Sequence, residues 1–188
     1  MRDQQLIYEN AGADRPAFLN GAYGFLNPEY PKFHKMNSLS QLGIIAADVL
    51  LKGTDLASEY LPDQIGVVLS NATSSLDTDI EYFETLKKIP SPSLFVYTLP
   101  NIVAGEICIR HHFKGENAFF VFEEFDGPFL SLYVDNILGN NSAQACLAGW
   151  VEVLADHYDV FLYWAEKQKR ELGIEHTAEN LIKLYISE

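Results

Sequence analysis

The sequence has few cysteines, few basic residues and no long apolar run. Its two cysteines, Cys108 and Cys146, stand inside apolar segments without the spacing of a metal site, so we interpret them as small buried residues and expect no metal. No apolar run approaches the length of a membrane span, and residues 1–5 lack the apolar region of a signal peptide. These absences predict a cytoplasmic protein that does not bind a membrane. P-loop, dinucleotide-binding and zinc signatures are also missing, so no cofactor is expected.

The shortage of basic residues makes the chain strongly acidic. It has 13 Lys plus Arg against 26 Asp plus Glu, a formal net charge of −13 at pH 7. Nucleic-acid binding is excluded, because phosphates need a basic footprint. Direct docking of another strongly acidic protein is disfavoured for the same electrostatic reason.

The sequence does contain enough apolar material for one sizeable core. It has 188 residues, of which 48% are apolar and 13% aromatic, and it shows neither a repeat nor a linker. We therefore expect a single domain over residues 1–188, with an irregular N-terminal segment at 1–35 and a polar tail at 166–188. Within the N-terminal segment, short strands at 6–8 and 22–25 are the elements that the pattern allows.

Between these ends, buried helices alternate with short strands, which predicts a layered α/β fold with a mixed sheet. Residues 94–97 are interpreted as a short extended piece or a loop between two of the helices. The helix at 128–138 is expected to be mostly buried. The predicted strands are 65–70, 118–123, 145–151 and 159–164, and the predicted helices are 38–52, 76–88, 100–113, 128–138 and 177–186.

The stretch around which the other elements are organised is a strand-to-helix elbow at 115–128. A turn-prone glycine leads into the apolar strand, two acids follow, and Asp126-Gly127-Pro128 opens a helix. Asp126 is a suitable N-cap, and proline is tolerated in the first helical turn. A helix N-terminus that faces the carboxyl end of a strand favours negative charge. The elbow is therefore the first place to look for a functional site.

Several segments together resemble the β-ketoacyl-acyl carrier protein synthases of the thiolase superfamily. The resemblance runs in order from residue 34 to about 165 and covers the N-terminal half of that family's fold. It implies a thiolase-like half-fold, with a mixed sheet packed against buried helices. The segments that carry it are 34–42 (HKMNSLSQL), 65–71 (IGVVLSN), 90–107 (PSP, then LPN and AGEI), 113–117 (FKGEN) and 145–152 (ACLAGWVE).

The resemblance also shows where this chain departs from the family. There, a nucleophilic cysteine lies nine residues after a conserved glycine, and counting from Gly115 gives Glu124 here. A carboxylate cannot replace a thiolate in thioester exchange, since it is the weaker nucleophile and its acyl product is a reactive anhydride. The family's catalytic histidines, or a related pair, come from a second half with no counterpart here. We therefore assign no catalytic residue, and interpret Phe125, Asp126, Gly127 and Asn101 as the remnant of an acyl-site lining.

Glu124 itself has three interpretations, two structural and one functional. It is either an acid stabilised by the helix N-terminus or part of a partner contact. The functional alternative, which the resemblance implies, is a gating or decarboxylation-promoting residue, the role ascribed to Gln in family members that lack the nucleophile.

These observations favour a non-catalytic ketoacyl synthase-like subunit that completes a dimer and shapes an acyl tunnel, as chain length factors do. The pathway would be fatty acid, aryl polyene or polyketide-type biosynthesis. Two alternatives stay open: an acyl-transfer or decarboxylase enzyme completed by a partner chain, and a stand-alone acyl-binding module. An acyl carrier protein would be contacted only indirectly, because it is itself acidic.

The resemblance further implies a dimer strand. In ketoacyl synthases the strand before the elbow pairs with its counterpart across the two-fold axis. The corresponding strand here contains neither lysine nor proline, so it has no residue that would prevent an exposed edge from pairing with another strand. The expected partner is a second copy or a full-length ketoacyl synthase; an interior strand is the alternative. The strand residues are Ala118, Phe119, Phe120, Val121 and Phe122.

Overall fold

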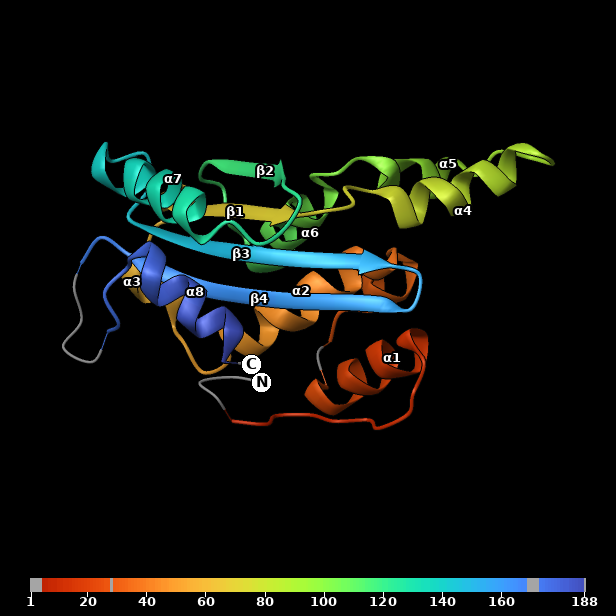
Figure 1. The fold of residues 1–188 in the computed structure, drawn as a ribbon, viewed down its shortest axis with the longest axis horizontal. Coiled ribbons are helices and arrows are strands. Elements are labelled where there is room, and N and C mark those ends of the chain that lie inside the picture. Colours follow the sequence, from red (N-terminus) through yellow and green to blue (C-terminus); the bar gives the residue numbers. More distant parts are fainter. Residues whose placement is uncertain (1–4, 28, 169–172, 188) are drawn as a thin grey trace.

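A mixed four-stranded sheet forms the centre of the protein in the computed structural model, which describes residues 5–27, 29–168 and 173–187 (Figure 1). The strand order is β2-β1-β3-β4, so β2 and β4 are the edge strands. β1 pairs in parallel with both β2 and β3, whereas β3 and β4 are antiparallel. This confirms the predicted α/β fold with a mixed sheet. The strands are β1 (Ile65–Asn71), β2 (Asn117–Val121), β3 (Ala145–Leu154) and β4 (His157–Glu166).

Helices cover both faces of the sheet, because the alternating side chains of β1 and β3 are apolar on both sides. One core contains Val67 and Leu69 with the buried faces of α1 (Arg15–Leu26), α2 (Ser38–Leu50) and α6 (Ile102–His111). The other contains Val68 with the buried faces of α7 (Gly127–Gly139) and α8 (Ala178–Ile186). The elbow between β2 and α7 therefore belongs to the face that α8 also covers (Figure 1).

The remaining elements are short, apart from one helix that extends away from the sheet. α4 (Leu76–Leu86) follows β1 and projects beyond it (Figure 1). No single helix in the described part of the chain is long and apolar enough to cross a membrane. The consecutive segments Pro92–Thr98 and Ile102–His111 together have the length and apolar composition of a membrane span, but the chain bends by 101° between them. The short elements are α3 (Leu56–Glu59), α5 (Pro92–Phe95) and the 3-10 turns η1 (Pro31–Lys35), η2 (Pro62–Gln64) and η3 (Val96–Thr98).

The prediction of an irregular segment at 1–35, with strands at 6–8 and 22–25, is wrong, because this segment contains α1. Asp14 accepts a hydrogen bond from the Ala17 N–H at 2.8 Å and so caps the helix. Gly21, a residue that disfavours a helix interior, is needed here for packing, because a Cβ there would lie 2.1 Å from the Tyr8 hydroxyl oxygen. Leu19 and Ala22 are then buried against the core.

Two smaller predictions also need correction. Residues 94–97 are neither a strand nor a loop: they lie in the helical turns α5 and η3, because Ser91 caps the first turn by accepting from the Leu94 N–H at 3.3 Å. α7 is less buried than expected, since its outer side exposes 72% of Leu132. The other predicted strands and helices are confirmed to within a few residues at their ends.

Candidate functional site

The elbow has the local geometry that its sequence predicts. β2 ends at Val121, a bend follows, and the Asp126 carboxylate accepts from the Phe129 N–H at 2.8 Å to cap α7. Glu124 lies in the bend and is exposed to solvent. Asn101, the other predicted lining residue, is exposed just before α6, a helix that packs on the opposite face of the sheet from α7.

The inner side of the elbow is closed by the C-terminal helix. The ring of Phe125 lies 4.5 Å from that of Tyr185 in α8 and 5.4 Å from that of Phe161 in β4. Gly127 is packed closely against α8, because a Cβ at this position would lie 2.9 Å from Ile182 Cγ1. The chain thus covers its own elbow with α8, and sequence reasoning did not anticipate this contact between residues more than fifty positions apart.

The loop after β1 is held by a buried acid from β3. The Glu152 carboxylate is 4% exposed and accepts hydrogen bonds from the Ala72 N–H at 2.6 Å, the Thr73 N–H at 3.1 Å and the Thr73 hydroxyl. A carboxylate surrounded by donors in this way stabilises a fixed loop conformation. Glu152 therefore sets the direction in which α4 leaves the sheet.

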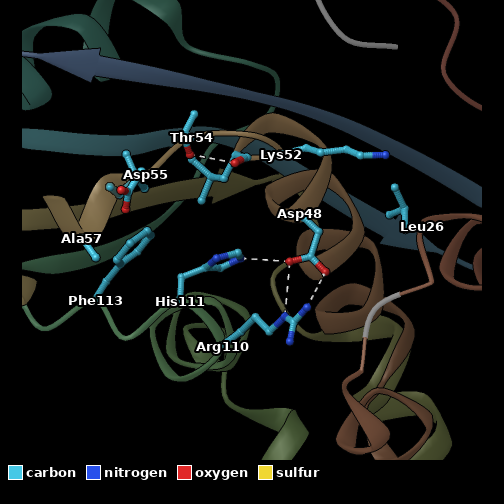
Figure 2. Close-up of a pocket in the computed structure, with 11 residues that line it drawn as sticks. Leu26, Asp48, Lys52, Thr54, Asp55, Ala57, Arg110, His111 and Phe113 are labelled. Atoms are coloured by element: carbon cyan, nitrogen blue, oxygen red, sulfur yellow. Dashed lines mark hydrogen bonds and ion pairs between the residues drawn. The ribbon is translucent and has the colours of Figure 1, made fainter. Parts of the chain in front are cut away.

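A second cluster of charged side chains lies on the other face of the sheet, at a pocket of about 420 Å³ (Figure 2). Arg110 donates two hydrogen bonds to the Asp48 carboxylate, from Nε to Oδ1 at 3.3 Å and from Nη2 to Oδ2 at 3.2 Å. His111 Nε2 lies 3.2 Å from Asp48 Oδ1. Arg110 also stacks over the Tyr30 ring at 4.7 Å. The contacts of Arg110 and His111 with Asp48 form a structural link between α2 and α6.

Sequence reasoning missed this cluster, although one signal was present. Asp48 is the only charged residue in the largely apolar helix Ser38–Leu50, and a lone acid in a buried helix needs a partner. Burial alone would raise the pKa of Asp48, but the contacts with His111 and Arg110 outweigh it and lower the pKa below its ordinary value of 3.8.

The variant Asp48→Asn is expected to lose about 1–3 kcal/mol of unfolding free energy at pH 7, because it leaves Arg110 without its anion. Since the folded-state pKa of Asp48 is depressed, its contribution is present above the unfolded pKa and is lost as the pH falls through the folded one. The difference from wild type should therefore shrink below about pH 4. Urea unfolding across this range measures it, with the exposed Asp156→Asn as control. An equal deficit at pH 7 and pH 2 would contradict the charge-based role.

A larger pocket, of about 1150 Å³, lies between α8, β4 and the turn after α2. Its wall includes Trp164 and Leu181, but acids such as Asp55, Asp135 and Glu175 also line it. An acyl-binding module would need a dry apolar cavity, which neither pocket provides. Among the described residues, no group of three His, Cys, Asp or Glu side chains is placed to hold a metal ion.

The edge formed by β2 is rich in half-buried aromatic rings. Phe120 lies 4.8 Å from the ring of Phe129 and 4.9 Å from that of Tyr133, and Phe122 lies 4.9 Å from Phe129. Phe122 N–H donates to Asn71 O in β1, and Glu116 O accepts from Val67 N–H. Because backbone directions alternate along a strand, the N–H groups of Phe119 and Val121 point away from β1 toward the open edge.

Comparison with known proteins places this fold. No family model matches the sequence, and no curated protein matches it. Solved structures do match the chain. One is an ishigamide ketosynthase/chain length factor (22% identity, TM-score 0.60, covering 80% of this chain and 45% of the other). A second is the ketosynthase ApeO in complex with its chain length factor ApeC from Xenorhabdus doucetiae (16%, 0.50, 67% and 51%), and a third is the AntDE:AntF complex, a type II polyketide synthase acyl-carrier protein with its ketosynthase bound to the hexaketide (18%, 0.53, 76% and 47%).

The likeness is one of fold. This chain spans about half the length of the structures that it matches. The thiolase-like half-fold that the sequence resemblance implied is therefore confirmed.

Proposed function

We propose that this chain is a non-catalytic ketosynthase-like subunit that pairs with a full-length ketosynthase in the cytoplasm and helps to set the length of the acyl product. One observation carries the proposal. In a fold shared with ketosynthases and chain length factors, the elbow presents an exposed Glu124 where the family resemblance places a cysteine. On this proposal the scaffold is retained while the nucleophile is replaced.

The chemistry of the remaining candidates agrees with a non-catalytic role. Burial raises the pKa of Cys108 to about 11 and that of Cys146 to about 12, so neither forms an appreciable thiolate near neutral pH. Among the described residues, one histidine–carboxylate pair, His111 with Asp48, is largely buried on both sides. Arg110 donates two hydrogen bonds to the same Asp48 carboxylate. Within the described part of the chain, catalysis would therefore lack an activated cysteine nucleophile.

The open edge of β2 supports pairing with another subunit. A strand with outward N–H and C=O groups and aromatic neighbours is suited to extension by a partner strand. A ketosynthase that adds a strand here would continue the sheet across the two chains. An acyl carrier protein would then dock on the ketosynthase, since the acidic charge of this chain disfavours direct binding.

The test combines a purified ketosynthase from the same organism, its loaded carrier protein and extender units, with and without this chain. We expect the chain to shift the distribution of product lengths while its own mass stays unchanged, because no nucleophile accepts the acyl group. Product analysis and intact-mass spectrometry of this chain give the two readouts. An acyl adduct on the wild-type chain, or an unchanged product distribution, would contradict the proposal.

A further inference from the structure

The carboxyl ends of β1 and β2 form a topological switch point of the sheet. The two strands are neighbours and run in parallel. The connection that follows β1 brings α6 onto one face of the sheet, whereas the connection that follows β2 places α7 on the other face. In open α/β sheets, ligands bind in the crevice outside the carboxyl ends of two such strands. The loop after β1, residues 72–75, therefore lies where a ligand would be expected.

In this loop, two successive backbone N–H groups point at a single oxygen atom. The N–H groups of Ala72 and Thr73 donate to Glu152 Oε2 at 2.6 and 3.1 Å, and the Thr73 hydroxyl donates to Oε1 of the same carboxylate. Successive N–H groups that converge in a turn form an anion-binding concavity. These three donors, hereafter the donor nest, hold the Glu152 carboxylate as they would hold an anionic ligand.

The shape of the donor nest is set by contacts that do not involve Glu152. The Asn71 side chain donates to the Ser74 carbonyl at 2.8 Å and accepts from the Ser74 N–H at 2.9 Å. Ser74 has a φ of 56°, in the left-handed region that turns use, and Leu76 N–H donates to the Thr73 carbonyl at 3.0 Å. The turn is therefore expected to keep its donors in place when the carboxylate is removed.

We propose that the donor nest is a binding site for a small carboxylate, which this chain fills permanently with its own Glu152. Glu152 is 4% exposed, so the wild-type site is closed to an external anion. Truncation of this side chain at Cβ would vacate the volume of an acetate and leave three donors without a partner. Because unpaired buried donors are costly, a soluble carboxylate should take the vacated place. This property of the chain does not depend on a ketosynthase partner.

The test is chemical rescue of Glu152→Ala by formate, which carries a carboxylate and is one carbon smaller than the group removed. Urea unfolding is measured in sodium formate and in sodium chloride at equal ionic strength. We expect the variant to be less stable than wild type in chloride, and formate to raise its urea midpoint in a saturable manner. At a formate concentration about ten times the Kd, the ratio of folded to unfolded variant should rise about tenfold, because formate binds the folded state only.

Three controls separate a site from a general salt effect. Wild type and Glu152→Gln should not respond to formate, because their side chains occupy the site. Val151→Ala removes apolar volume from the same strand, at a side chain that is 0% exposed, but leaves no donor without a partner. It should be destabilised and should unfold at the same midpoint in formate and in chloride.

Equal midpoints of Glu152→Ala in the two salts would overturn the proposal. A response of Glu152→Gln or Val151→Ala as large as that of Glu152→Ala would overturn it as well, since formate would then act elsewhere. If Glu152→Ala does not fold in chloride, dilution from urea into formate should recover the wild-type circular dichroism spectrum. A variant that stays unfolded in formate would also contradict the proposal.

Discussion

Replacing Leu181 by aspartate is expected to destabilise the chain by more than about 3 kcal/mol, because the substitution places an unpaired charge in an apolar contact. Leu181 is 3% exposed and belongs to the core that α7, α8 and the sheet share. The effect should appear as a lower urea midpoint and as increased binding of a hydrophobic dye, since the aromatic rings around Phe125 lose their cover.

Ile186→Asp is the matched control for this variant. It introduces the same charge into the same helix, at a side chain that is 75% exposed, and should change the midpoint little. If Leu181→Asp and Ile186→Asp unfolded at the same urea concentration, α8 would not be the cover of the elbow that the structure describes.

Val121→Pro is expected to abolish the complex with a ketosynthase while the chain itself stays folded. Val121 is at the open edge, and its N–H points away from β1, so proline removes a donor that only a partner strand would use. Val121→Thr keeps both the N–H group and the β-branched shape and should assemble like wild type. The complex is measured by light scattering after chromatography, and folding by thermal unfolding. Assembly of Val121→Pro at wild-type affinity would exclude pairing through this strand.

The parts of the fold that could be predicted from sequence are those with a local signal. β1 and α2 are largely apolar runs, and the start of α7 is marked by Asp126 as N-cap and by Pro128 in the first turn. α1 has the same kind of start signal, an Asp14 N-cap followed by Pro16, but it also contains Gly21 and Gly24, residues that disfavour a helix interior. The helix is explained by the cap together with the burial of Leu19 and Ala22 and the close approach of Tyr8 to Gly21.

The same distinction applies to the candidate site. The elbow could be located because strand, acids and N-cap are adjacent in sequence. The cover provided by α8 and the link between Asp48 and Arg110 join residues that are tens of positions apart. Hydrophobic periodicity describes which side of an element is apolar, but not which other element packs against it. The exposed side chains Leu76, Ile80 and Phe83 of α4 are a further example, since their helical spacing alone predicts burial.

The most direct test of the central claim is the mass of this chain purified with and without a co-expressed ketosynthase from the same organism. The account predicts that co-expression yields one complex, with a mass equal to one ketosynthase chain plus the 21.2 kDa of this one. Two separate species, a ketosynthase dimer and a 21.2 kDa monomer, at concentrations well above those in the cell would contradict it.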